Sequence, residues 1–196
     1  MKDKIKVIDL FRYPLGIAHL NQNIKELIKF SKEVQKNEKS VVKTNKGGFQ
    51  SPANIEKYNK KIFNDLYAII FELAGKFSGL YNLNKPIKYG NSWININSPY
   101  SFNSLHTHPK AIISAVFYIK VPKNSGQIIF RRPEKLIGYL DDENIHMYNS
   151  FNSSAQIFTP KENQLFLFPA WLEHEVSQNL SKQDRISLAI NFECTK

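Results

Sequence analysis

The sequence predicts a mainly β fold with supporting α-helices, on two observations. After Pro86 the chain consists of short segments rich in Ile, Val, Phe and Tyr, separated by Pro and Gly, a pattern typical of an antiparallel sandwich or barrel. Before Pro86, two longer segments repeat their apolar residues with a period near 3.6, which is typical of helices with one buried face. Helices followed by strands indicate helices packed on one face of a β-sandwich.

The first predicted elements are a strand and a helix. Residues 5–11 (IKVIDLF) are apolar and β-branched, and Pro14 and Gly16 follow them, so we expect a short strand there. Residues 21–38 begin with polar residues and then place their apolar residues on one helical stripe. The segment 21–38 is therefore predicted to be a helix that supports one sheet face.

A second helix is predicted over residues 52–83. Ser51 offers an N-cap side chain, and Pro52 stands at the first helical position, where its missing N–H costs nothing. Residues 39–50 are expected to form the connecting loop. The expected buried stripe of the second helix consists of Ile55, Ile62, Leu66, Ile69, Ile70, Leu73 and Phe77.

Six strands are predicted in the C-terminal half. They are residues 92–96, 111–121, 127–130, 156–159, 164–168 and 185–192. The stretch 131–155 has little periodicity and is expected to be a long loop. Lids commonly exclude water from active sites, so Tyr148 and Phe151 in this loop are candidates for closing over a substrate.

Length and composition indicate one globular domain. The chain has 196 residues, of which 42% are hydrophobic and 13% aromatic, enough to bury a substantial core. We therefore expect a single domain over 1–196, with supporting elements in 1–89 and a β core in 90–193. A single cysteine, Cys194, excludes an intramolecular disulfide, and no run reaches the roughly 18 apolar residues that span a bilayer. The first residues lack a signal-peptide pattern, so we expect a cytoplasmic protein.

The positive charge is concentrated in the N-terminal half. Residues 1–90 carry 17 basic and 8 acidic side chains, whereas residues 91–196 carry 10 and 9. Most of the excess consists of single lysines in a helical pattern, for which a solvated helix face is the simplest explanation. A weak contact with a polyanion is the alternative, but no Arg-rich run, zinc-finger spacing or RNA-binding signature supports a nucleic-acid partner.

Three histidines form a candidate metal site. His106 and His108 precede a long apolar strand, and their i, i+2 spacing directs both side chains to one face if the segment is extended. His174 follows another apolar strand and would be the third ligand if these strands are neighbours. Three imidazoles suit zinc, iron, copper or nickel. Only neutral imidazole binds a metal, so binding should weaken below about pH 6.5.

A purely structural interpretation of these histidines stays open at this point: the HTH segment would be a polar loop and His174 a turn residue. The order of the surrounding residues favours the metal site. That order comprises LHTHPKAIISAVFYIKVPKNSGQIIF at 105–130, LFLFPAWLEHEV at 165–176 and DRISLAINF at 184–192.

In these residues the sequence resembles the 2-oxoglutarate/iron(II)-dependent oxygenases, in particular a subfamily with an HxHP motif before a strand that ends in tyrosine. It is also similar to prolyl hydroxylases in the same run. The resemblance covers about residues 90–193, and TNKGGFQS at 44–51 is also reminiscent of the subfamily. It implies a double-stranded β-helix, the jelly-roll or cupin-like fold, with the metal ligands on strands at the mouth of the barrel.

The resemblance also implies roles for individual residues. Iron(II) would be held by His106, His108 and His174, which would be the catalytic residues. Arg185 would pair its planar guanidinium with the distal carboxylate of 2-oxoglutarate, which lysine would match poorly. The remaining co-substrate-binding residues would be Ser187 on the same strand face and Tyr118. Strand geometry rather than the resemblance adds Asn95 to these co-substrate-binding candidates. A surface ion pair of Arg185 with Asp184 or Glu175 is the alternative.

Further pocket residues are predicted from strand geometry. Trp93, Asn95 and Asn97 share one strand face and are assigned to the pocket, with a mixed outer face as the alternative. Gln50, Ser51 and Asn103 are weaker pocket candidates, while His19 and His146 lie outside any motif.

His108 is a departure from the resemblance, because the superfamily usually has a carboxylate at this position. Either the metal has three neutral histidine ligands, or His106 and His174 hold it with solvent, or an acid such as Glu173 or Glu175 supplies the missing charge. We favour three histidines.

The implied reaction is oxidative decarboxylation of 2-oxoglutarate to succinate, coupled to hydroxylation of an unactivated C–H bond. Iron(II), 2-oxoglutarate and dioxygen would be required, and ascorbate is a candidate reductant. A peptidyl proline or another amino-acid side chain is the expected substrate, by analogy alone. Two other functions stay open: a cupin-like three-His metal protein without oxygenase activity, and a metal-free module whose basic helices bind an acidic partner.

Overall fold

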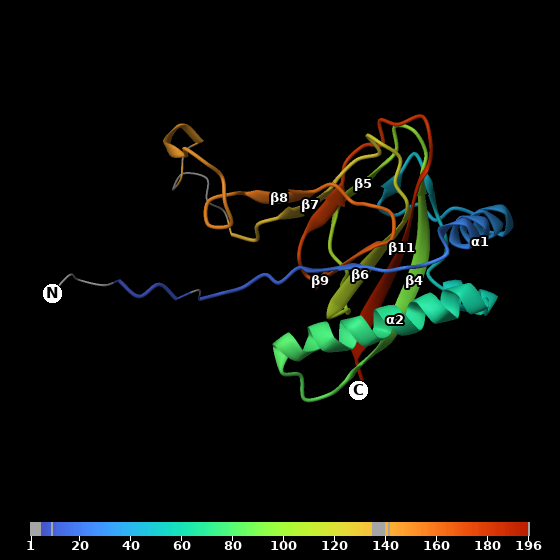
Figure 1. Cartoon of the computed structure of the whole chain (residues 1–196), viewed down its shortest axis with the longest axis horizontal. Coiled ribbons are helices and arrows are strands. Elements are labelled where there is room, and N and C mark those ends of the chain that lie inside the picture. The colour runs from blue at the N-terminus through green and yellow to red at the C-terminus, as the bar shows by residue number, and fades with distance from the viewer. Residues whose placement is uncertain (1–4, 9, 135–139, 141, 196) are drawn as a thin grey trace.

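The computed structural model describes residues 5–8, 10–134, 140 and 142–195, and two antiparallel sheets form its body (Figure 1). The larger sheet has six strands in the order β1 (Gly16–His19), β9 (Gln164–Pro169), β6 (Ile113–Lys120), β11 (Arg185–Cys194), β4 (Ile87–Asn97) and β3 (Phe49–Gln50). The smaller sheet has five strands in the order β2 (Asn45–Lys46), β5 (Phe102–His106), β10 (His174–Val176), β7 (Ile128–Arg131) and β8 (Ala155–Phe158). The predicted mainly β class is confirmed.

Two helices pack against the larger sheet. Helix α1 (Ile24–Asn37) starts at Asn23, whose side chain accepts a hydrogen bond from the Glu26 backbone N–H, and it contacts β6. Helix α2 (Lys61–Ser78) contacts β4 and β6 and lies across the sheet in Figure 1. The described part of the chain also contains three short 3-10 helices: η1 (Ile55–Tyr58), η2 (Gly79–Tyr81) and η3 (Asp142–Asn144).

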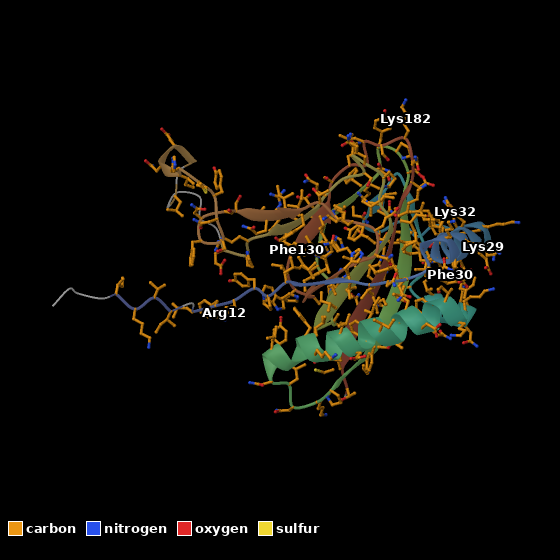
Figure 2. All side chains as sticks on the ribbon, in the orientation of Figure 1. Arg12, Lys29, Phe30, Lys32, Phe130 and Lys182 are labelled. Carbon is orange, nitrogen blue, oxygen red and sulfur yellow. The ribbon has the colours of Figure 1, made fainter. Side chains whose placement is uncertain are left out.

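Strand alternation divides the apolar core into two clusters. On β6, Phe117 and Ile119 belong to the cluster shared with the helices, whereas Tyr118 belongs to a smaller cluster. Phe166 and Phe168 of β9 and Phe130 of β7 join Tyr118 in the smaller cluster, and Figure 2 shows Phe130 in the body of the sheets. Since alternate residues of a strand face opposite ways, the side chains opposite the helices point toward the smaller sheet. On β11 those side chains are mostly polar, which leaves a polar interior for a site.

The first helix was predicted correctly, whereas the second begins later than predicted. The Ser51 side chain does not cap a helix; its hydroxyl accepts a hydrogen bond from the Ile94 backbone N–H at 3.0 Å. Only the short helix η1 follows, and Asn59 in the left-handed region (φ 44°) separates it from α2. The predicted stripe is partly buried, but Ile69 is 37% exposed, while Phe63 and Ala74 are buried instead. Ser51 and Pro52 therefore mark the end of a strand rather than the start of a helix.

The predicted strand at 5–11 was wrong for the residues that the structure describes there. These residues pair with no other strand, and Ile5, Val7 and Phe11 are exposed. The first strand is β1, which pairs with the edge of β9. Apolar, β-branched composition alone does not make a strand, because a strand also needs a partner edge for its backbone groups.

The segment 131–155 is largely without regular structure, as expected, although residues 135–139 and 141 lie outside the described residues. Tyr148 and Phe151 are exposed. The proposed closure of these rings over a substrate therefore stays a prediction.

The lysines of α1 form a solvent-exposed face. Lys25, Lys29, Lys32 and Lys36 are all exposed, while Leu27, Phe30 and Val34 on the opposite side are buried. Figure 2 shows Lys29 and Lys32 on this helix. Lys32 pairs with Asp184 at 2.7 Å. This arrangement is what a solvated helix face requires.

Within the described residues, no helix is both long and apolar enough to cross a membrane.

Candidate metal centre

The structure brings His106, His108 and His174 together. His106 is the last residue of β5 and is the cross-strand partner of His174 at the start of β10. His108 lies just beyond β5, where its backbone N–H donates to the Ala170 carbonyl at 2.8 Å. One ring nitrogen from each of the three side chains lies within 4.8 Å of the others. Pairing of β5 with β10 thus joins residues that are far apart in sequence.

Backbone carbonyls fix the orientation of two of the rings. The Nδ1 of His106 is 2.7 Å from the Ser104 carbonyl, and the Nδ1 of His174 is 2.9 Å from the Leu172 carbonyl. A carbonyl only accepts hydrogen bonds, so each Nδ1 carries the proton and each Nε2 keeps its lone pair. Such partners orient metal-binding histidines in proteins. The Nε2 atoms of His108 and His174 are 3.2 Å apart, within the roughly 3–3.4 Å expected for two nitrogens bound to one metal ion.

All three histidines are held neutral. Burial lowers the pKa of His106, and burial together with the neighbouring imidazoles lowers the pKa of His108 and His174, the latter to about 3. Neutral imidazole is the form that binds metal. Protons should therefore compete with a metal for these nitrogens only below pH 6.5, the pH that the pKa of an unperturbed histidine would indicate.

The metal-free protein is expected to lose stability as the pH falls below about 6.5. The unfolded chain then takes up protons that the folded protein, with its lowered histidine pKa values, does not, so the free energy of unfolding decreases. The loss continues as the pH falls toward the folded-state values. Thermal unfolding between pH 7 and 5 in the presence of a chelator measures this effect. His108→Ala should flatten the dependence, and a wild-type melting temperature that does not change over this range would contradict the prediction.

The two acidic residues considered as metal ligands in place of His108 do not belong to the histidine cluster. Glu173 is exposed, and Glu175 forms an ion pair with Arg131 on the surface of the smaller sheet. Within the described residues, the candidate metal group contains only the three histidines. The geometry thus favours three neutral ligands over the two alternatives that the sequence left open.

A cavity between the sheets extends from the histidines along β11. Three alternate residues of β11 each form a row with the residues that they pair with on the neighbouring strands. Ala189 of β11 stands between Trp93 of β4 and Val116 of β6. The next row places Ser187 between Asn95 and Tyr118, and the last pairs Arg185 with Asn97. The lining is completed by a set of mostly apolar or neutral residues: Thr44, Asn103, Ala115, Ile128, Phe168 and Val176. The histidines and Arg185 therefore belong to one cavity.

Arg185 does not form either of the ion pairs considered as alternatives. Asp184 binds Lys32 and Glu175 binds Arg131. The Arg185 side chain is almost fully buried, and its guanidinium donates to the backbone carbonyls of Ser125 and Ser177, the latter at 3.3 Å. Within the part of the chain that the structure describes, no carboxylate neutralises it. A buried cation without a counter-ion is costly, so this end of the cavity suits an anion.

Two polar atoms that line this cavity are buried without a hydrogen-bond partner among the described residues: the Tyr118 hydroxyl and the Trp93 indole nitrogen. Burial raises the pKa of Tyr118 to about 12, so its hydroxyl stays protonated and can donate. Orphaned donors of this kind are rare inside proteins. Their presence in a cavity that also holds the Arg185 guanidinium fits an acceptor-rich, anionic ligand.

The predicted pocket residues fall into two groups. Trp93, Asn95, Asn103, Tyr118, Arg185 and Ser187 line the cavity, whereas Asn97, Gln50 and Ser51 do not. Asn97 instead donates to the side chain of Asn45 at 3.3 Å, within a buried amide cluster. Sequence reasoning did not assign Thr44 to the pocket, although Thr44 begins the TNKGGFQS segment, and it missed Val116, which alternation from Tyr118 could have indicated.

The donor set fits a transition metal. Three neutral imidazole nitrogens converge, two of them already oriented by carbonyl partners, and they suit iron(II) and its neighbours in the first transition series. The other end of the same cavity offers a guanidinium and two hydroxyls, which suit a carboxylate.

Sequence comparison identifies one family. Residues 91–191, just over half of the chain, match the model of a family described as "Putative 2OG-Fe(II) oxygenase". No match to a curated protein sequence was found.

Solved structures with the same fold include a prolyl-4-hydroxylase from Pseudomonas putida, with a TM-score of 0.66 and 14% identity over 94% of each chain. HygX from Streptomyces hygroscopicus, crystallised with nickel and 2-oxoglutarate, has a TM-score of 0.63 and 11% identity over 92% of this chain and 83% of that one. A Trichoplax adhaerens prolyl hydroxylase, in complex with a peptide fragment of the hypoxia inducible factor oxygen degradation domain, has a TM-score of 0.66 and 13% identity over the same shares. The predicted double-stranded β-helix is confirmed by this likeness.

Proposed function

The chain belongs to the 2OG-Fe(II) oxygenase family, and from that premise we propose that it hydroxylates an unactivated C–H bond of an amino-acid side chain, with peptidyl proline as the first candidate. Members of the family use iron(II), 2-oxoglutarate and dioxygen. Together these supply the oxidation: 2-oxoglutarate and dioxygen become succinate and carbon dioxide while one oxygen atom enters the C–H bond. The protein binds, orients and shields the reactants.

Each end of the cavity has its own task in this proposal. His106, His108 and His174 hold the iron through their Nε2 atoms. Arg185 receives the distal carboxylate of 2-oxoglutarate, assisted by the hydroxyls of Tyr118 and Ser187, while Asn95 lies beside Ser187 in the same row. The observation that carries the proposal is the buried Arg185 guanidinium, which no carboxylate of the described residues neutralises, at one end of a cavity whose other end holds three neutral imidazoles.

Two observations support a peptide substrate. The similar structures include two prolyl hydroxylases, one of them bound to a peptide. Most of the described residues of the 131–155 segment are exposed, so their surface is accessible to a partner. The two alternative functions are less well supported. Family membership indicates an oxygenase rather than a cupin-like metal protein without oxygenase activity. The clustered neutral histidines argue against a metal-free basic module.

Succinate release tests the substrate assignment. Protein loaded with iron(II) without oxygen is exposed to air with 2-oxoglutarate and a panel of peptides, half of which contain proline. We expect succinate formation to rise with proline-containing peptides and the peptide mass to increase by one oxygen atom. Oxidation of other residues alone would overturn the choice of proline, and the absence of succinate with every peptide would overturn the choice of a peptide.

His108 distinguishes the possible ligand sets. His108→Ala is expected to lower iron(II) affinity by more than about 100-fold, because it removes one of three ligands, whereas His108→Asp should retain affinity by restoring a carboxylate to the site. Metal content after dialysis against a graded chelator series measures both effects. An alanine variant that binds iron as tightly as the wild type would leave a two-histidine site.

A further inference from the structure

Trp93 has a buried hydrogen-bond donor that the proposed roles do not use. Its side chain lies on β4 and is 8% exposed, and its indole nitrogen has no hydrogen-bond partner within the described residues. A buried tryptophan usually finds a partner for its N–H, because leaving the group unpaired costs free energy. The side chain lines the cavity of the metal centre. The missing acceptor is therefore to be sought in a ligand of that cavity.

The position of Trp93 indicates at which end of the cavity the acceptor of its N–H would lie. Its ring lies against the ring of His108, with the centroids 5.5 Å apart. Along the β4–β11 ladder, Trp93 stands in the row of Ala189, two rows from Arg185. Each residue of a strand advances by about 3.3 Å, so these two rows are roughly 13 Å apart along the strand. Trp93 thus belongs to the histidine end and Arg185 to the opposite end, with Ser187 in the row between them.

The chemistry of the indole matches a carboxylate. An indole N–H donates and never accepts, and its hydrogen bond is stronger when the acceptor is charged. No acidic side chain lines the cavity among the described residues, so a bound anion meets no like charge there. A 2-oxo acid carries a carboxylate at each end, and only the distal one has partners in the proposed function.

We propose that the Trp93 indole N–H donates a hydrogen bond to the carboxylate at the 2-oxo end of the co-substrate. This assignment rests on the proposed use of 2-oxoglutarate at this site. It makes Trp93 a co-substrate-binding residue that holds the 2-oxo acid end beside the histidines, while Arg185 holds the distal end. The ring contact with His108 keeps the indole in place.

Calorimetry on the nickel-loaded protein tests the hydrogen bond without requiring turnover. Trp93→Phe removes the N–H and keeps an aromatic ring against His108. We expect it to weaken 2-oxoglutarate binding about 10- to 100-fold, the range for one hydrogen bond to a charged group, with nickel affinity unchanged. The chain has two tryptophans, and Trp171→Phe is the matched control, since Trp171 is 49% exposed and outside the cavity. The control should bind 2-oxoglutarate as the wild type does.

A shorter ligand identifies the carboxylate concerned. 2-Oxobutyrate keeps the 2-oxo acid end and lacks the distal carboxylate. The loss caused by Trp93→Phe should persist with this ligand, whereas the loss caused by Arg185→Leu should disappear. If the Trp93→Phe loss disappears with 2-oxobutyrate, the hydrogen bond goes to another group and the assignment is overturned.

A closer isostere of tryptophan separates the loss of the hydrogen bond from a change in side-chain packing. In the Trp171→Phe background, benzothienylalanine can be incorporated at position 93, where sulfur replaces the indole N–H and the shape of the ring is kept. The same loss of affinity is expected. Wild-type affinity in both the phenylalanine and the benzothienyl proteins would overturn the role of Trp93 and leave the proposed function intact. A wild-type protein that binds nickel but not 2-oxoglutarate would overturn the proposed function itself.

Discussion

Alanine in place of His174 is expected to remove iron(II) binding and succinate formation together. His174 is 4% exposed, its Nδ1 is fixed by the Leu172 carbonyl, and its Nε2 lies 3.2 Å from the Nε2 of His108. Loss of a partner that merely orients a ligand costs roughly 10–100-fold in metal affinity, so loss of the ligand itself should cost more than about 100-fold. Iron content measured without oxygen, together with succinate release, gives both quantities. His106→Ala should behave in the same way.

The control for this experiment is His19→Ala. His19 is exposed at the end of β1, and the same substitution there should change neither quantity. Because His174 is buried, thermal unfolding of each metal-free variant must show that the fold is kept. A folded His174→Ala protein that retains iron(II) at wild-type affinity would refute the three-histidine centre.

Replacing Arg185 by leucine is expected to weaken 2-oxoglutarate binding by roughly 100-fold or more while metal content stays near normal. The substitution removes a buried guanidinium, and two charge-assisted hydrogen bonds together contribute about 3 kcal/mol or more, which corresponds to this factor. It removes no candidate metal ligand, since Arg185 lies at the opposite end of the cavity. Calorimetric titration of the metal-loaded variant with 2-oxoglutarate measures the loss. Ser187→Ala should show a smaller loss in the same direction.

Leucine at position 185 also leaves the carbonyls of Ser125 and Ser177 without their guanidinium partner, which can destabilise the fold. Arg185→Lys is therefore a second variant that keeps the charge and loses the planar fork, and it should also bind 2-oxoglutarate more weakly than the wild type. Arg131→Leu, which breaks only the surface pair with Glu175, is the matched arginine control. Equal 2-oxoglutarate affinity in the wild type and the folded Arg185 variants would exclude the assigned role.

The long strands could be predicted because their signal is local. β4, β6, β9 and β11 are rich in β-branched and aromatic residues, and each lies at or near its predicted position. β5 and β10 were missed as strands, because they are short and carry polar residues such as Asn103 and Glu175. They are nevertheless the strands that pair His106 with His174. Strands of this kind are stabilised by their partners rather than by their own composition.

Local sequence patterns and distant partners also lead to different assignments for residues near the cavity. Strand alternation placed Trp93, Asn95 and Asn97 on one face, but only the first two line the cavity, because Asn97 donates to Asn45. Ser51 looked like a helix cap and instead accepts a hydrogen bond from the backbone of β4. In both cases the competing partner comes from a segment distant in sequence. A local pattern carries no information about such a partner.

The sequence by itself determined the family resemblance, the mainly β class, the first helix and the names of the candidate ligands, because these depend on residue type, spacing and period. Only the tertiary structure decided that the three imidazoles converge and that burial keeps them neutral. It also decided that Arg185 has no carboxylate partner among the residues that the structure describes, while Glu175 pairs with Arg131. Convergence depends on the register between β5 and β10, and neutrality and charge pairing depend on burial. Both are properties of chain segments brought together by folding, so no single segment of the sequence contains them.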